Sequence, residues 1–432
     1  MPDRMPLTLR AYRRLAAAAS PLLPLLIARR LKRGKEDPGR VMERRGVASK
    51  QRPHGPLVWI HGASVGEMLA MVPIAEHIDQ RGFNVLVTSG TVTSAQLAEW
   101  RLPPGVMHQF VPYDTPRFVA RFLDYWQPAL GIFAESDLWP NLIMAGAERR
   151  IPLVLVNGRL SERSFRRWKH FPVTISALLA HFELCLAQSA ADAGRYTELG
   201  APRVTTTGNL KLDADAPPAD AKALNAMTRA INQRPVIAAA STHPGEEKII
   251  VDVHRALRDR FPGLLTVVAP RHPERGDGVL DIARGADLNA VARSRGHLPD
   301  RGTDIYVADT IGELGLIYRV APIVFVGGSL VRHGGQNPIE AAKLGSAIVH
   351  GPHVWNFAEI YAELDRAEGA AEVQDAERLT NRIGTWLLDS GACRSAAEAA
   401  LQTVETLGGA HARTLAALEP YLMQLRLEHR RA

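Results

Sequence analysis

The stretch HGASVGE, His61 to Glu67, places one carboxylate at the predicted turn between a strand and a helix. It follows the apolar run PLVWI and precedes MLAMVPIAEHI, whose apolar spacing is typical of a helix. Ser64 and Glu67 match a capping box, in which the Ser oxygen accepts the N–H of the third helical residue while the Glu reaches back. A carboxylate in such a turn is also placed to act as a general base. Phosphate binding by the N–H groups of the turn is the third interpretation.

A second candidate site lies in GGQNPIEAA, where the residue types predict the start of a helix. We expect Asn337 as the N-cap, Pro338 in the first helical position and Glu340 in the first turn. Exposed N–H groups at such a start bind phosphate, and a carboxylate one step inside can hold ribose hydroxyls. The alternative is a capped helix in which Glu340 only complements the helix dipole.

Arg271 follows the apolar run LLTVVAP, where its guanidinium could hold a phosphate or carboxylate by a two-pronged contact. An arginine that only extends from a strand end to solvent is the alternative. The pair Asp213-x-Asp215 resembles the metal ligands of some nucleotide-sugar enzymes, but it lies beside two prolines rather than after a strand. The histidines show no H-x-x-x-H spacing. We therefore expect neither a metal nor another cofactor.

Length and charge set the class of protein. A chain of 432 residues exceeds what one hydrophobic core supports and predicts two domains. The formal net charge of +7 indicates an anionic partner, which is a nucleic acid, a phosphate-bearing molecule or an acidic membrane surface. Cys185 and Cys393 are the only two cysteines, which excludes a disulfide framework and favours a reducing compartment.

The N-terminal segment carries an apolar run, Leu15 to Ala28, between two pairs of arginines. This run is shorter than the ~20 apolar residues of a spanning helix, and Pro21 and Pro24 interrupt it. We expect it to lie on the cytoplasmic face of the membrane, with its apolar side in lipid and its arginines on anionic headgroups. The alternative is an amphipathic helix packed on its own domain.

The elements that must position these residues are short apolar strands alternating with helices. The predicted strands are PLVWI, NVLVTS, MHQFVPY, ALGIFAE, PLVLVNG, FELCLAQ and RVTTTG, followed beyond LDADAPPADAK by PVIAAAST, LLTVVAPR, DIYVADT, PIVFVGG and SAIVHG. Continuous apolar strands separated by helices predict parallel sheets covered on both faces. The fold class is therefore α/β, with two Rossmann-like doubly wound domains facing across a cleft and ligands at the carboxyl ends of the strands. Neither G-x-G-x-x-G nor a Walker motif supports a nicotinamide or ATP enzyme.

The motifs resemble those of a known family. HGASVGE, ESDLWPNLI, NGRLSERS, GNLK, STHPGEE, PRHPER, DTIGEL and GGQNPIEAA with GPHVWNF occur in the order seen in the 3-deoxy-D-manno-octulosonic acid (Kdo) transferases. The resemblance runs from the N-terminal segment to near the C-terminus. It implies a GT-B glycosyltransferase of the inner membrane that adds Kdo from CMP-Kdo to a lipid A precursor of the lipid IVA type, with inversion by single displacement.

The resemblance also implies roles for individual residues. Glu67 matches the general base of the family, and Glu135 and Lys211 match positions thought to assist the transition state. The CMP contacts carried over are Pro270, Arg271, Gly312, Glu313, Leu314, Asn337, Pro338, Ile339 and Glu340. Departures from the family pattern are Gly62, Asp137 and Gln336, of which the first two are expected to touch no assigned catalytic group.

The domain limits and partners complete the expectations. We predict a membrane-anchoring segment at 1–35, an acceptor-binding domain at 36–212, a linker at 213–224, a CMP-Kdo-binding domain at 225–412 and a final helix at 413–432 that could pack back on the first domain. The expected partners are CMP-Kdo, the lipid A precursor and anionic lipids of the inner membrane, without nucleic acid. The alternative enzymes are a lipid A disaccharide synthase or a UDP-sugar epimerase, and the alternative without activity is a basic scaffold.

Overall fold

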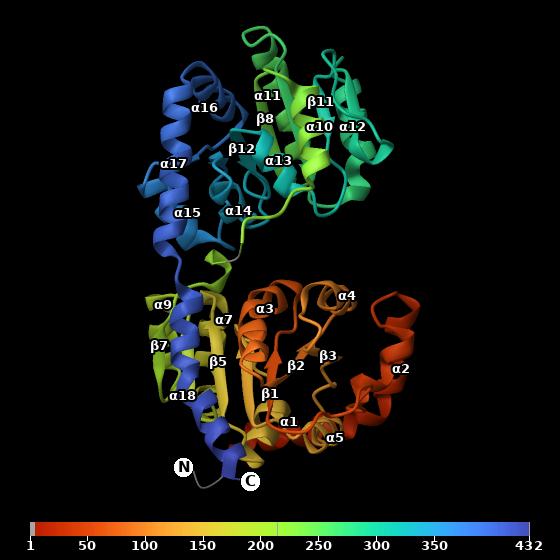
Figure 1. Ribbon diagram of the computed structural model, residues 1–432, viewed down its shortest axis with the longest axis vertical. Helices are drawn as coiled ribbons and strands as arrows, with labels where there is room; N and C mark the ends of the chain where they lie inside the picture. Colours follow the sequence, from red (N-terminus) through yellow and green to blue (C-terminus); the bar gives the residue numbers. More distant parts are fainter. Residues whose placement is uncertain (1–4, 214, 432) are drawn as a thin grey trace. The chain divides into compact units, whose positions relative to one another are not determined.

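The computed structural model describes residues 5–213 and 215–431, which form two compact units (Figure 1). The first unit contains the described residues through Asp213 and again from Gly408 onward, and the second contains Asp215–Leu407. The predicted division differs from this one, because residues 408–412 belong to the first unit. Within the predicted linker, α10 already begins at Ala221. Residues 1–4, 214 and 432 of the predicted segments lie outside the described residues.

The first unit is built on a seven-stranded parallel sheet of order β3-β2-β1-β4-β5-β6-β7. Its strands are β1 Leu57–His61, β2 Asn84–Ser89, β3 Met107–Phe110, β4 Leu130–Ala134, β5 Leu153–Gly158, β6 Leu184–Ala187 and β7 Val204–Thr206. Its helices are α1 Leu7–Ala19, α2 Leu23–Lys32, α3 Val65–Gln80, α4 Val92–Arg101, α5 Pro116–Trp126, α6 Pro140–Glu148, α7 Glu162–Lys169, α8 Pro172–Leu179, α9 Ala190–Glu198 and α18 Ala410–Arg431, with 3-10 turns at Ser20–Leu22, Pro38–Arg45 and Leu210–Leu212. The strand order reverses between β1 and β4, which makes this the topological switch point of the sheet.

The second unit repeats this plan with the order β10-β11-β9-β8-β12-β13-β14. Its strands are β8 Val236–Thr242, β9 Leu265–Pro270, β10 Ala290–Ala292, β11 Ile305–Val307, β12 Ile323–Val326, β13 Ala347–His350 and β14 Ala370–Glu372. Its helices are α10 Ala221–Ile231, α11 Glu246–Arg258, α12 Gly276–Arg284, α13 Leu314–Val320, α14 Ile339–Lys343, α15 Ala358–Arg366, α16 Ala376–Leu388 and α17 Ser390–Leu407, with 3-10 turns at Pro273–Arg275 and Arg293–Arg295. The switch point lies between β8 and β12.

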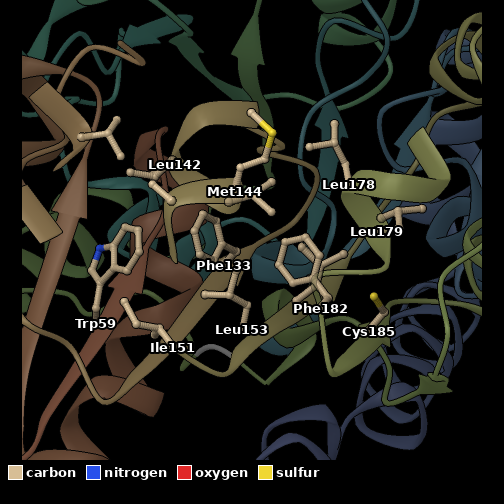
Figure 2. Close-up of a cluster of buried hydrophobic side chains, with 14 of the residues drawn as sticks. Trp59, Phe133, Leu142, Met144, Ile151, Leu153, Leu178, Leu179, Phe182 and Cys185 are labelled. Atoms are coloured by element: carbon tan, nitrogen blue, oxygen red, sulfur yellow. The ribbon is translucent and has the colours of Figure 1, made fainter. Parts of the chain in front are cut away.

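Alternating residues of the first sheet build two hydrophobic cores, one on each face. Trp59 of β1 and Phe133 of β4 point to one face, where they meet residues of α6 and α8 and Phe182, as Figure 2 shows. The neighbouring residues Val58 and Ile132 point to the other face, which α3 and α18 cover. Burial on both faces explains why the strands read as continuous apolar runs.

The last helix, α18, packs on the first unit through Leu418, Leu422 and Leu425 (Figure 1). Its start is fixed by Asp213, whose carboxylate accepts the N–H groups of Gly409, at 2.6 Å, and of His411. The carboxylate that resembled a metal ligand therefore caps a helix. Asp213, near the point where the chain leaves the first unit, thus bonds the segment by which the chain re-enters it.

The packing of α18 predicts that Leu418→Ala destabilises the first unit by about 2–5 kcal/mol, since Leu418 is fully buried in its core. Met423 lies on the same helix and is 57% exposed, so Met423→Ala should change the free energy of unfolding by less than about 0.5 kcal/mol. Urea unfolding followed by tryptophan fluorescence compares the two variants. Equal, small losses of stability would contradict the assignment of α18 to this core.

Candidate active site

Glu67 lies at the switch point of the first unit, in the first turn of the helix that follows β1. The structure shows a complete capping box: Ser64 Oγ accepts the Glu67 N–H at 3.3 Å, and Glu67 Oε2 accepts the N–H groups of Ala63, at 2.8 Å, and of Ser64, at 3.4 Å. The Ser64 hydroxyl donates to Oε1 at 2.8 Å. A carboxylate has about four lone-pair positions, so these bonds leave Oε1 able to accept one further proton. The cap does not preclude chemistry.

Burial is the largest influence on Glu67 and raises the pKa of its carboxyl group. The negative charges of Asp137 and Glu135 raise this pKa further, against the lowering effect of the hydrogen bonds from Ser64 and Ala63. A raised pKa makes the carboxylate a stronger base.

Glu135 and Lys211 form an ion pair beside Glu67. Glu135 directly follows β4 and has a φ of +55°, a strained conformation for a residue with a side chain. Lys211 Nζ lies 2.6 Å from Glu135 Oε1. A Cβ atom added to Gly66 would lie 3.9 Å from the same ammonium nitrogen, which places Lys211 at the start of α3. The three residues that the family resemblance singles out in this unit are therefore neighbours.

His61 and Asp137 form a second polar pair at this edge of the sheet. His61 is fully buried at the end of β1, with Nε2 3.3 Å from Asp137 Oδ2 and Nδ1 2.9 Å from Thr88 Oγ1. Thr88 Oγ1 also accepts the indole N–H of Trp59 at 2.9 Å and lies 3.5 Å from the carbonyl oxygen of Ile60, to which its hydroxyl can donate. Burial, the largest single influence, would raise the pKa of Asp137, but the effects of His61, Trp139 and Ala63 together lower that pKa.

In the second unit, the predicted nucleotide residues lie at the carboxyl edge of the sheet. Arg271 follows β9 and is exposed, and its charge lowers the pKa of Glu340, although burial has the larger and opposite effect and the net pKa is raised. Asn337 Nδ2 donates to Glu340 Oε1 at 3.2 Å. Arg271, Asn337 and Glu340 are thus close enough to act on one ligand.

The start of α14 differs from its prediction by one residue. The helix is five residues long and begins at Ile339, so Pro338 is its N-cap and not its first helical residue. Asn337 Oδ1 still accepts the Ile339 N–H at 3.1 Å, as a capping side chain would. Because this N–H is already satisfied and Pro338 and Ile339 are buried, Asn337 and Glu340 are the partly exposed side chains of the group.

The remaining predicted contacts, Gly312 to Leu314, follow β11, the strand next to β9. Gly312 is exposed, with a φ of +85°. The Glu313 carboxylate is held by Arg293 at 2.7 and 3.0 Å, so its side chain is already paired. Pro270, the last residue of β9, is buried. These residues share one edge of the sheet, and among the described residues no hydrogen bond or ion pair joins Glu313 to Arg271.

Comparison with known protein sequences identifies the family. A family model described as 3-deoxy-D-manno-octulosonic-acid transferase (kdotransferase) matches residues 39–214. A 3-deoxy-D-manno-octulosonic acid transferase of Rickettsia bellii is 35% identical over 383 residues, which are 88% of this chain and 91% of that protein. The chain belongs to the Kdo transferase family.

Solved structures bear on the fold alone. A glycosyltransferase from Rickettsia africae has a TM-score of 0.60 at 12% identity, covering 85% of this chain and 98% of that one. A UDP-GlcNAc 2-epimerase from Neisseria meningitidis, bound to UDP-GlcNAc, has a TM-score of 0.59 at 12% identity, covering 84% of this chain and all of that one, 100%. The predicted GT-B fold is confirmed. Transferases and epimerases share it, so the choice of a Kdo-transferring glycosyltransferase of lipopolysaccharide biosynthesis rests on the sequence relatives.

Two of the residues that depart from the pattern of the Kdo transferases lie next to the candidate base. Gly62 and Asp137, which were expected to touch no assigned catalytic group, both lie near Glu67. A Cβ atom on Gly62 would lie 3.2 Å from Glu67 Cβ, and the charge of Asp137 raises the pKa of Glu67. Sequence reasoning also missed His61. Its position at the end of β1, beside the switch point, was the available signal.

The effect of the Asp137 charge predicts the direction in which the pKa of Glu67 changes when that charge is removed. Asp137→Asn removes a negative charge near Glu67, so the pKa of the Glu67 carboxyl should fall toward its ordinary value. Titration by 13C-carboxyl NMR measures it, with Glu67→Gln used to assign the signal. Asp124→Asn removes a carboxylate that pairs with Arg149 on the surface and should leave the pKa of Glu67 unchanged. An equal or higher pKa in Asp137→Asn would refute the coupling.

Proposed function

We propose that this Kdo transferase takes Kdo from CMP-Kdo and adds it to a lipid A precursor of the lipid IVA type, with Glu67 as general base. The observation that carries the proposal is the surroundings of Glu67. Its carboxylate has a raised pKa, keeps a lone pair on Oε1 and lies beside the Lys211–Glu135 ion pair at a switch point.

The chemistry is a single displacement with inversion. Oε1 of Glu67 takes the proton of the acceptor hydroxyl while that oxygen bonds to the anomeric carbon of Kdo. The bond from this carbon to the phosphate oxygen breaks, and CMP leaves with the electron pair. We assign Lys211 to stabilising negative charge on the donor, since an ammonium is a strong partner for carboxylate or phosphate.

The second unit is proposed to bind the CMP part of the donor. Arg271 is exposed and cationic, which suits the phosphate. Asn337 and Glu340 present an amide and a carboxylate, which suit the hydroxyls and base edge of a nucleoside. The backbone of Gly312, free of a side chain, can approach a ligand closely.

Glu67→Gln tests the base. The amide oxygen can still accept the Ala63 N–H, so the fold and the cap should persist, while kcat falls about 10²- to 10⁴-fold with CMP-Kdo and a lipid A precursor. Mass spectrometry of the product follows transfer. Glu76→Gln, on the exposed side of the same helix, is the matched control and should keep wild-type rates. Transfer by a folded Glu67→Gln within a few-fold of wild type would remove Glu67 from this role.

We further propose that the segment α1–α2 holds the enzyme on the cytoplasmic face of the inner membrane. One face of this segment packs on the first unit: Leu9 is buried in its core, and Arg13 pairs with Glu148 at 2.5 Å. The outward leucines are Leu7, Leu15, Leu22, Leu25 and Leu26, at 77, 70, 68, 77 and 44% exposure. Within the described ranges, no helix is both long enough and apolar enough to cross a bilayer. Exposed leucines beside arginines favour a surface contact with anionic lipid.

The double variant Leu22→Glu/Leu25→Glu tests this contact. Two added negative charges at exposed positions should reduce binding to vesicles of anionic phospholipid at least tenfold and leave unfolding unchanged. Leu388→Glu, at a 61% exposed position of the second unit, is the control. Wild-type binding should also weaken as salt rises. Equal co-sedimentation of the double variant and the wild type would exclude the segment as the anchor.

A further inference from the structure

Glu246, the first residue of α11, places a fully buried carboxylate beside the switch point of the second unit. Its Oε2 accepts the N–H groups of His243, at 2.9 Å, and Gly328, at 2.7 Å. Its Oε1 accepts those of Ser329 and Leu330, both at 3.0 Å. His243 follows β8 and Gly328 to Leu330 follow β12. One carboxylate therefore ties together the two loops that flank the switch point.

These four hydrogen bonds use the full accepting capacity of the carboxylate and satisfy a glycine-rich loop from within the protein. Buried N–H groups need acceptors, and a loop that offered them to a ligand would lack partners until the ligand arrived. Here Glu246 occupies the place that a phosphate takes in phosphate-binding loops. The segment from Gly328 to Leu330 is consequently a support for the site and not a phosphate cradle.

The same loop is tightly fitted to its neighbours. A Cβ atom on Gly327 would lie 2.5 Å from the carbonyl oxygen of Ser241, so only glycine fits there. Ser329 Oγ donates to the Val326 carbonyl at 2.5 Å and accepts the Gly351 N–H at 2.9 Å. The loop therefore has little freedom once the carboxylate is in place.

Backbone hydrogen bonds connect the loop after β12 to the segment that leads into the proposed nucleotide residues. The Gly335 N–H donates to the carbonyl of Gly328 at 2.8 Å, and the Gln336 N–H donates to that of Gly327 at 3.1 Å. Asn337 follows at once. The Gln336 amide also meets the His243 ring, with Nε2 atoms 3.0 Å apart, and that ring stacks on His333 at 3.7 Å between centroids. Both loops held by Glu246 thus contact Gln336, the residue before Asn337.

We propose that Glu246 is a positioning residue for donor binding: it fixes the two switch-point loops of the second unit so that Asn337 and Glu340 stand ready for the nucleotide. The inference rests on the proposed function, in which this unit binds CMP-Kdo. A preformed site binds its ligand more tightly than one that must be ordered first. Loss of the carboxylate should therefore raise the KM for the donor more than it lowers kcat.

Glu246→Gln and Glu247→Gln make a matched pair of variants. Both residues are fully buried at the start of α11, but Glu247 bonds Arg275 and Thr242 and none of the N–H groups of the loop. In Glu246→Gln an NH₂ group faces two backbone N–H groups. We expect its donor KM to rise at least tenfold, with kcat within about threefold and the KM for the lipid acceptor within twofold of wild type. Glu247→Gln should keep its donor KM within about threefold.

An unchanged donor KM in folded Glu246→Gln, or an equal rise in both KM values, would overturn the proposal. If Glu246→Gln does not fold, Glu246→Asp takes its place. It keeps the charge on a shorter side chain and should raise the donor KM by less than the tenfold expected for Glu246→Gln. Hydrogen exchange on the wild type is independent of activity: the amides of Gly328, Ser329 and Leu330 should exchange as slowly as those of β12, and fast exchange would refute the clamp.

Thermal unfolding of the wild type with CMP keeps the two ideas separate. Protection by CMP supports donor binding, whereas no protection by CMP or CMP-Kdo counts against the proposed function while the exchange result still decides the clamp.

Discussion

The reversal of strand order beside β1 and beside β8 is the constraint on which both sites depend. Connections leave a parallel sheet in opposite directions at such a point, and the loops that follow the two central strands separate. Their backbone N–H groups then lack the partners that a neighbouring loop would supply. In each unit a glutamate from the helix after the first central strand fills this gap: Glu67 bonds Ala63 and Ser64, and Glu246 bonds His243 and the loop after β12.

The two glutamates occupy equivalent positions but differ in exposure, in the number of their hydrogen bonds and in the charges near them. Glu246 is fully buried, and its four N–H partners occupy both oxygens. Such a group is fixed and has no capacity for a substrate proton. Glu67 is partly exposed, has an oxygen with spare capacity and lies near two further negative charges, which add to the effect of burial in raising its pKa. Environment, and not residue type or helix position, distinguishes the carboxylate that only holds loops together from the one that can still accept a proton.

Apolar and β-branched runs were sufficient to predict twelve of the strands, because most of these strands are buried on both faces and are therefore apolar along their length, although β7 is largely exposed. The strands β10 and β14 were not predicted: each is a short, partly exposed edge strand made largely of alanine, AVA and AAE, a residue that is uncommon in strands. Motif order singled out Glu67, Glu135 and Lys211, but the closeness of Gly62 to Glu67 and the effect of the Asp137 charge on it depend on how the loops after β1 and β4 fold together. No spacing along the chain contains that information. The four-bond role of Glu246 is hidden for the same reason, since three of its four partners lie more than eighty residues away.

The Lys211 ammonium lies at the start of a helix, an unfavourable place for a cation because the helix start carries partial positive charge. Its ammonium lies close to Gly66 in the first turn of α3, and the 2.6 Å ion pair with Glu135 compensates for this. The pair is partly exposed, so water weakens it and an arriving anion can compete for the lysine. In the proposed mechanism, an anionic sugar that drew Lys211 away from Glu135 would leave the negative charge of Glu135 uncompensated near Glu67. That change would raise the pKa of Glu67 further and so couple the binding of the anion to the strength of the proposed base.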